Sequence, residues 1–212
     1  VGLIGELVRC GADVDQAKAK GWTSLIIAAQ MGHLAVVMKL IAAGADVNKA
    51  TTDDGTTPLY MAAQNDHLAV VTKLIAAGAD VKKATTDHGR TPLFIATQQG
   101  HLTVVTKLIA AGADVNKALT TYGATPLSIA VQQGHLAVVT MLIAAGADVN
   151  KARTTDGATP LYIAAENGHL TVVTKLIAAG ADVDKATTDD GSTPLYIAAQ
   201  EGHTAIVSKL LQ

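Results

Sequence analysis

Cysteine, aromatic residues and long apolar segments are all scarce in this chain of 212 residues. Its single cysteine, Cys10, rules out an intrachain disulfide, so we expect a reducing, intracellular compartment, most simply the cytoplasm. Hydrophobic residues make up 49% of the chain, but no apolar run approaches the ~18 residues that a transmembrane helix needs. No signal peptide is visible either, and we expect no membrane insertion.

The chain also lacks a large excess of positive or negative charge. The 16 basic and 18 acidic residues give a formal net charge of −2. Such a balance provides no electrostatic reason to expect a nucleic acid or an anionic lipid as the partner. A neutral partner fits this composition better.

What the sequence has in abundance is repetition. The residues Gly-Ala-Asp-Val recur at an interval of 33 and then of 34 residues, beginning at Gly11, Gly44, Gly78, Gly112, Gly146 and Gly180. A constant period of ~20–50 residues is typical of a solenoid, in which each repeat contacts its neighbours. The pattern predicts a single array over residues 1–212, with residues 1–10 as a partial repeat. Because neither end has a polar capping pattern, we expect the chain to be a fragment of a longer one.

Each repeat begins with a short helix. In the copy at residues 51–81, Thr57 can accept a hydrogen bond from an exposed amide at a helix start, and Pro58 suits the first helical position. The equivalent positions predict helix pairs starting near residues 23, 57, 91, 125, 159 and 193. A glycine suited to a left-handed cap follows this helix in the other copies, whereas Asp66 stands there in this one.

A second helix begins at His67, with Leu68, Val71, Leu74 and Ile75 on its expected buried side. Both helices are shorter than the ~12–15 residues at which an isolated helix becomes marginally stable in water, so stacking must stabilise them. The segment between helix pairs carries turn residues and predicts a hairpin-like connection. The expected fold class is therefore all-α, with β-hairpin-like loops.

These features resemble the ankyrin repeat, which has a period of about 33 residues and the signature Thr-Pro-Leu-His-x-Ala. The matching segments are TPLYMAA at Thr57, TPLFIAT at Thr91, TPLSIAV at Thr125, TPLYIAA at Thr159 and Thr193, and TSLIIAA at Thr23. Together with Gly-His-Leu and Gly-Ala-Asp-Val, they extend the match over essentially the whole chain. The resemblance implies stacked helix–turn–helix units that bind another protein.

Two departures from the family pattern affect the loops. The histidine after Thr-Pro-Leu is replaced in every copy, so another group must hold the loop. The replacements are Ile26, Tyr60, Phe94, Ser128, Tyr162 and Tyr196. Gly44 and Gly55 are eleven residues apart, as in the later copies, whereas Gly11 and Gly21 are ten apart. We expect the extra residue to enlarge every hairpin after the first.

Recurrent histidines and aspartates raise the question of a metal or catalytic site. The histidines are His33, His67, His101, His135, His169 and His203. Equivalent residues of stacked helices lie ~8–10 Å apart, whereas the ligands of one zinc ion each lie ~2.0–2.1 Å from it. We expect these histidines to satisfy the turn between the helices. Aspartate is common in hairpin turns, and no nucleophile, base and orienting group can be distinguished. The sequence predicts no enzyme activity, no metal and no cofactor.

Asn48, Asn116 and Asn150 follow Gly-Ala-Asp-Val, and this segment resembles the ankyrin segment that an oxygen-sensing asparaginyl hydroxylase modifies. The alternative is that asparagine suits the turn on its own account, as Asp15 and Asp184 do at equivalent positions. Both interpretations stay open at the level of sequence.

Stacked repeats align their hairpins and first helices into an extended concave surface of the kind that solenoids use for binding. The resemblance places the partner-binding residues at the hairpin tips and the first-helix ends. They are Asp53, Asp54, Thr56, Asp87, His88, Arg90, Gln98, Gln99, Tyr122, Ala124, Gln132, Gln133, Asp156, Glu166, Asn167, Asp189 and Asp190. Because arginine and tyrosine are favoured at interface hot spots, Arg90 and Tyr122 are the predicted anchors.

The tyrosines that replace the family histidine have two possible roles. Tyr60, Tyr162 and Tyr196 either form a binding stripe or pack between the first helix and the lengthened hairpin. We favour packing, because a large ring buries much area and its hydroxyl can replace a lost hydrogen bond. Trp22 is expected to cover part of the first loop.

The leading functional prediction is a protein-binding segment of a larger intracellular protein. The alternative is a structural spacer, or an array that associates end to end with other copies of itself. A third possibility is that the repeats regulate an enzyme or channel domain elsewhere in a longer chain. Function must be argued from a site rather than from a fold, so the partner stays unnamed.

Overall fold

The computed structural model describes residues 11–212, and the predictions for Cys10 and for the partial repeat at residues 1–10 lie outside this range. The chain divides into two compact units, Val1–Asp114 and Val115–Gln212. Each unit is a stack of helix pairs. That the two units continue as one array stays a prediction.

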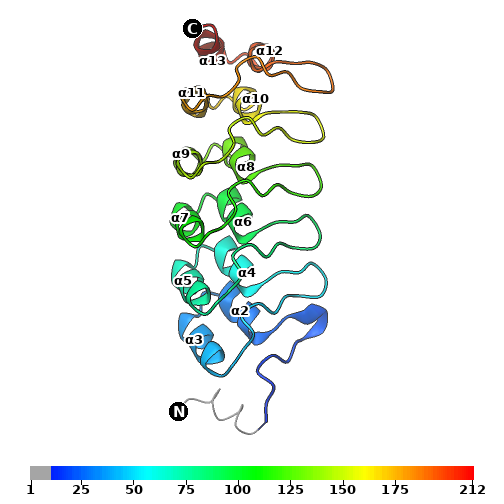
Figure 1. Cartoon of the computed structure of the whole chain (residues 1–212), viewed down its shortest axis with the longest axis vertical. Helices are drawn as coiled ribbons and strands as arrows, with labels where there is room; N and C mark the ends of the chain where they lie inside the picture. The colour runs from blue at the N-terminus through cyan, green and yellow to red at the C-terminus, as the bar shows by residue number, and fades with distance from the viewer. Residues whose placement is uncertain (1–10) are drawn as a thin grey trace. The chain divides into compact units, whose positions relative to one another are not determined.

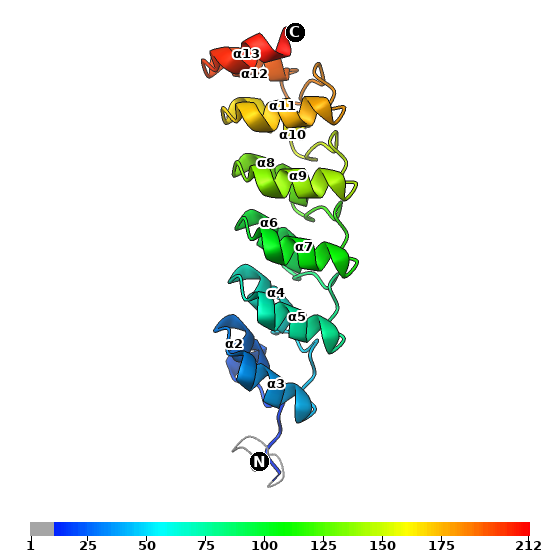
Figure 2. The same ribbon diagram turned by 90° about the vertical axis from the view of Figure 1, so that its left-hand side faces the viewer.

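The first unit contains a 3-10 turn and three helix pairs. In chain order they are η1 (Ala19–Gly21), α2 (Ser24–Gln30), α3 (Leu34–Ala42), α4 (Pro58–Gln64), α5 (Leu68–Ala76), α6 (Pro92–Gln98) and α7 (Leu102–Ala110). The first helices α2, α4 and α6 pack on one another in sequence order, and the second helices α3, α5 and α7 do the same (Figures 1 and 2). Within this unit, the loops between the pairs project to one side of the stack (Figure 1).

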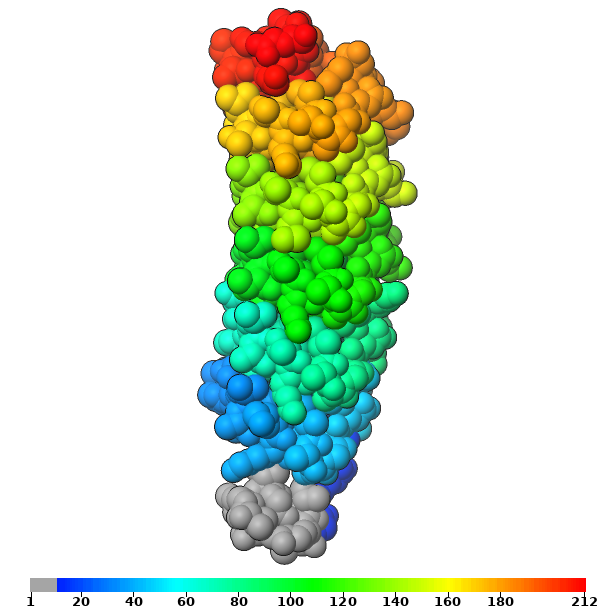
Figure 3. Space-filling view, turned by 60° about the vertical axis from the view of Figure 1, so that its left-hand side comes forward, coloured from blue at the N-terminus to red at the C-terminus, as the bar shows by residue number. Residues whose placement is uncertain are grey.

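The second unit repeats this arrangement. Its helices are α8 (Pro126–Gln132), α9 (Leu136–Ala144), α10 (Pro160–Glu166), α11 (Leu170–Ala178), α12 (Pro194–Gln200) and α13 (Thr204–Leu210). Here α10 packs between α8 and α12, and α11 packs between α9 and α13. In the space-filling view, side chains of adjacent second helices within each unit meet over one face (Figure 3). Over residues 11–212 the regular elements are helices, with one isolated bridge between Ala17 and Thr23, which confirms the predicted fold class.

The first helices start where the sequence predicts. Thr57 Oγ1 accepts a hydrogen bond from the Tyr60 N–H at 3.1 Å, and Pro58 takes the first helical position. The threonines that cap the equivalent helices in the same way are Thr23, Thr91, Thr125, Thr159 and Thr193. These caps satisfy an amide that the short helix cannot pair internally.

Burial is most complete in the first helices. Every residue of α4 from Pro58 to Ala63 is buried, because α2 and α6 cover two sides of this helix and α5 covers a third. In α5, the buried side chains are Val70, Val71 and Leu74. The prediction for Leu68 was wrong, since this side chain is 39% exposed. Leu68 begins its helix, and helical side chains lean toward the N terminus, which carries this one beyond the neighbouring helices.

Histidines at the starts of the second helices link adjacent repeats. His67 Nε2 lies 3.0 Å from the Gln30 carbonyl oxygen of the preceding repeat, and His203 Nε2 lies 3.1 Å from the Glu166 carbonyl oxygen. His101 and His169 make the same contact with Gln64 and Gln132. The histidines thus satisfy a carbonyl at the end of the preceding first helix, rather than only the turn of their own repeat.

A glycine makes room for this histidine link. Gly168 has a left-handed φ of 74°, and a Cβ at this position would lie 2.8 Å from the ring of His203. Gly202 has a φ of 76°, but nothing lies within 4 Å of its Cβ position. The two glycines therefore share a backbone conformation and differ in what surrounds them.

We predict that Gly168→Ala lowers the free energy of unfolding by about 2–3 kcal/mol, of which about 1 kcal/mol reflects the left-handed backbone and the rest the displaced histidine. The matched variant Gly202→Ala should lose only the backbone contribution of about 1 kcal/mol. Urea unfolding of both variants measures the difference. Equal losses would show that the histidine link adds nothing to stability.

Asparagines link adjacent repeats on the loop side. Asn48 Nδ2 donates to the Gly78 carbonyl at 3.2 Å, and its Oδ1 accepts from the Asp80 N–H at 2.8 Å. Asn116 and Asn150 bond in the same way to the Gly and Asp of their following repeats. The Nδ2 and Oδ1 atoms of each amide are therefore both hydrogen-bonded to the following repeat, which gives these asparagines a structural role. Their hydroxylation stays a prediction.

We predict that Asn48→Ala lowers the free energy of unfolding by about 1–2 kcal/mol, because two hydrogen bonds between repeats are lost, each worth about 0.5–1.5 kcal/mol. Lys82 stands at the equivalent position of the next repeat and has an exposed side chain. Lys82→Ala should therefore change stability by less than about 0.5 kcal/mol. Chemical denaturation compares the two, and a comparable loss in both variants would contradict the role of Asn48.

Candidate functional site

The hairpin loops carry most of the predicted binding residues. In the first hairpin the Lys18 N–H donates to the Trp22 carbonyl, whereas in the second the Thr51 N–H donates to the Thr56 carbonyl. The later hairpins close in the same way as the second. One more residue is thus enclosed at each later tip, which confirms the prediction from the glycine intervals.

An aspartate and two hydroxyl residues hold the hairpin in place of the missing family histidine. Asp54 Oδ1 accepts hydrogen bonds from Thr51 Oγ1 at 2.5 Å and from the Thr56 N–H at 3.0 Å. Thr51 Oγ1 in turn accepts from the Thr56 N–H at 2.8 Å. The last hairpin repeats this network with Thr187, Asp190 and Ser192. In the hairpin before it, Arg153 pairs with Asp156 instead. These three tips are therefore ordered by their own side chains.

These hydrogen bonds lower the pKa of two tip carboxyls. Burial alone would raise the pKa of Asp54, but hydrogen bonds from Thr51 and Thr56 outweigh it and lower that pKa below its usual value. Hydrogen bonds from the hydroxyls of Thr187 and Ser192 lower the pKa of Asp190 to about 2. Both side chains are thus carboxylates at neutral pH.

Most of the predicted binding residues are accessible. The exposed ones are Asp53, Asp87, Gln99, Tyr122, Gln132, Gln133, Glu166, Asn167, Asp189 and Asp190. Those of intermediate exposure are Asp54, His88, Arg90, Gln98 and Asp156. Thr56 and Ala124 are only 1% and 4% exposed, so their prediction as contact residues was wrong. Each closes the base of its hairpin, where the loop folds onto the first helix.

Arg90, one of the predicted anchors, is engaged inside the first unit. Its side chain hydrogen-bonds to the hydroxyl of Tyr60, which belongs to the preceding repeat and is 5% exposed. Burial raises the pKa of Tyr60, and Arg90 partly opposes this effect. The packing role predicted for Tyr60 is confirmed. Tyr122, the other predicted anchor, is 40% exposed.

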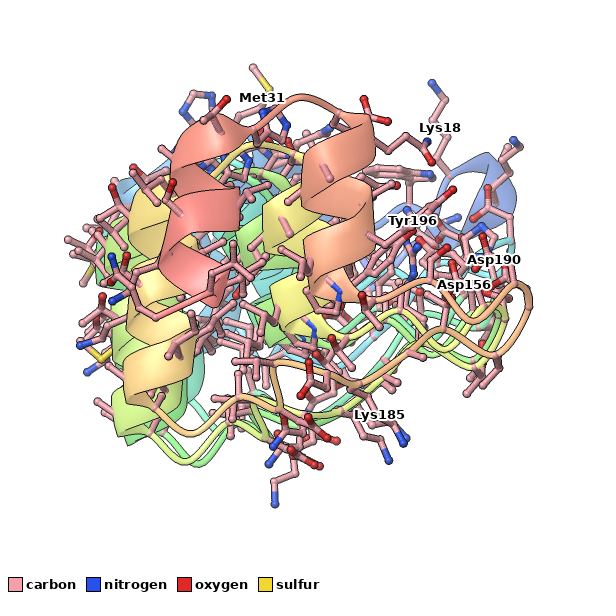
Figure 4. The ribbon with its side chains drawn as sticks, turned by 90° about the horizontal axis from the view of Figure 1, so that it is seen from above. Lys18, Met31, Asp156, Lys185, Asp190 and Tyr196 are labelled. Atoms are coloured by element: carbon pink, nitrogen blue, oxygen red, sulfur yellow. The ribbon has the colours of Figure 1, made fainter. Side chains whose placement is uncertain are left out.

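Aromatic and acidic side chains share one side of the second unit. Figure 4 shows Asp156 and Asp190 at the projecting ends of their loops and Tyr196 on the helix side of them, whereas Lys185 lies across the loops from Tyr196. Tyr196 is 58% exposed, so the packing prediction was wrong for this copy. In this copy the ring presents a large apolar face beside ionised carboxylates.

A family model of ankyrin repeats matches the chain three times, over residues 2–85, 81–153 and 149–212. The chain belongs to the ankyrin-repeat family. Ankyrin repeats are generally protein–protein interaction modules and typically have no catalytic activity. No curated protein matches the chain.

The ankyrin repeats show no arrangement for metal chemistry within residues 11–212, where no group of three or more His, Cys, Asp or Glu side chains is placed to hold an ion. Over the same residues, no helix is long and apolar enough to cross a bilayer.

One hollow in the described ankyrin repeats lies away from the hairpin tips. It has a volume of about 910 Å³ and lies on the face of α2 and α3, where Trp22, Ile27 and Val36 line it. Ile27 is 46% exposed, whereas the equivalent Ile95 is 3% exposed beneath the preceding repeat. The predicted cover of the first loop by Trp22 is thus incomplete, since its ring also borders this hollow. End-to-end association of copies through this face stays a prediction.

We predict that Asp190→Asn weakens the dependence of stability on pH between pH 4 and pH 2. The pKa of Asp190 falls from 3.8 to about 2 in the folded state, so folding favours the carboxylate. Its contribution to stability is complete above about pH 4 and is lost as the pH falls to about 2. Urea midpoints measured across this range test the prediction.

The control for this experiment is Asp189→Asn, because the Asp189 side chain bonds only to the Asp190 N–H. Parallel loss of stability in the wild type and in Asp190→Asn down to pH 2 would show that the Thr187 and Ser192 bonds are not responsible.

Proposed function

We propose that these ankyrin repeats bind another protein through the surface formed by the hairpin tips and the first-helix ends. The proposed setting is a reducing, intracellular compartment, in keeping with the single cysteine. The observation that carries the proposal is the contrast between constant buried positions and variable exposed ones.

The repeats keep a buried leucine and change one position at their tips. Leucine stands at the second helical position in each unit, as in Leu59 and Leu161, which are at most 1% exposed. At one equivalent tip position, by contrast, His88 is replaced by Tyr122 and then by Asp156 in the following copies. Variable side chains on a constant scaffold are typical of a recognition surface.

The hydrogen bonds that fix some of the tip side chains also support a role in binding. Asp54 and Asp190 are fixed by hydrogen bonds within their own hairpins, as described above. A side chain that is already ordered loses less conformational entropy when a partner binds. The surface therefore offers preorganised carboxylates and exposed amides from Gln99 and Gln133.

We predict that Tyr122→Ala combined with Gln99→Ala weakens the binding of a purified partner about tenfold or more, because truncation of an aromatic contact commonly has this effect. The partner is first isolated by affinity capture and then prepared alone for calorimetry. Thr72→Ala combined with Thr140→Ala, on exposed positions of α5 and α9, should leave affinity unchanged. Loss of binding only in the threonine variant would move the site to the second helices.

A further inference from the structure

Glutamate is distributed unevenly over the described residues. It occurs there only as Glu166 and Glu201, both exposed and both at first-helix ends of the second unit. In the first unit the equivalent positions hold uncharged residues, Met31 in one copy and amides such as Gln64 and Gln98 in the others. The first-helix ends of the second unit therefore carry two glutamates, whereas in the first unit the carboxylate that follows α4, Asp66, lies 3.9 Å from His101.

Glu166 acts together with the hairpin carboxylates. Burial raises the pKa of the Tyr162 hydroxyl, and the negative charges of Glu166, Asp190, Asp189 and Asp156 raise it further. Tyr162 is half-buried on α10, so these four carboxylates reach one side chain from the helix end and from two hairpins. The negative charges of these four carboxylates therefore add up over one part of the surface of the second unit.

Little positive charge opposes this field. The guanidinium of Arg153 is occupied by its ion pair with Asp156. Lys185 lies on the other side of the loops from Tyr196 (Figure 4). Tyr196, with its ring 58% exposed beside this field, adds an open aromatic face. Carboxylates and an open aromatic ring are the two groups that attract a guanidinium or an ammonium group most strongly.

We propose that the surface of the second unit formed by Tyr162, Tyr196, Glu166, Glu201, Asp189 and Asp190 binds a basic segment of a protein partner. This inference rests on the proposed function and adds the chemistry of the partner. Arginine is favoured over lysine, because its planar guanidinium can bond to a carboxylate through two N–H groups and also stack on a ring.

The first unit supplies an internal comparison. Its tyrosine at the equivalent position, Tyr60, is buried and bonded to Arg90. Its tip residue Asp53 pairs with Lys20 at 3.5 Å. The same fold thus presents a surface of mixed charge in one unit and an acidic, aromatic surface in the other.

The test measures the binding of a short synthetic arginine-rich peptide to the whole chain by calorimetry. Glu166→Gln combined with Glu201→Gln installs the residue type of the first unit, and we expect it to raise the Kd about tenfold. Asp53→Asn combined with Asp87→Asn removes the same charge from the first unit and should change the Kd less than about twofold. Urea midpoints of all variants confirm that they fold.

A second pair of variants tests the aromatic contribution. Tyr196→Phe keeps the ring and should bind as the wild type does, whereas Tyr196→Leu should raise the Kd about threefold to tenfold. Addition of salt should weaken the wild-type complex, because exposed charge pairs are screened.

The outcomes separate this inference from the proposed function. If the peptide does not bind, or binds equally to both double charge variants, the inference is overturned. A purified partner that depends on Tyr122 and Gln99 but not on Glu166 and Glu201 would overturn the inference and leave the proposed function standing. If binding of the purified partner depended only on Thr72 and Thr140 of the second helices, both the inference and the proposed function would be overturned.

Discussion

Helices of seven to nine residues set the constraint on which the rest of this protein depends. Such helices are not stable alone, so the folded state exists only where the apolar face of one pair covers that of the next. Leu59, Leu93, Leu127 and Leu161 are almost fully buried for this reason. Apolar packing is not directional. The histidine and asparagine hydrogen bonds between repeats therefore fix how one repeat lies on the next.

The helix interfaces and the hairpin tips have different roles in this fold. Because most of the buried apolar side chains lie at the helix interfaces, residues at the tips can differ from copy to copy. Some tips nevertheless have a fixed shape, since a local network such as that of Thr187, Asp190 and Ser192 closes them. A surface that is both variable and ordered is suited to recognition of a specific partner.

Charge then distinguishes copies that share one backbone. Amides stand at Gln64 and Gln98 in the first unit, whereas Glu166 of the second unit adds its charge to the carboxylates of neighbouring hairpins. A few substitutions at equivalent positions therefore change the electrostatic character of the surface without disturbing the core. Selectivity in a repeat protein can arise in this way, through like and unlike charges placed on an unchanged scaffold.

The sequence by itself determined the features that depend on neighbours along the chain. Thr57 and Pro58 predict the start of a helix, and the left-handed residues Gly168 and Asp66 end one. The repeat period predicts that the helix pairs stack. Only the tertiary structure decided which side chains other repeats cover. It buries Thr56 at a hairpin base, exposes Leu68, and engages Arg90 with Tyr60 of another repeat. The physical reason is that caps and turns are bonds within a few residues, whereas burial depends on segments about 34 residues away in the chain, whose side-chain directions a sequence pattern does not specify.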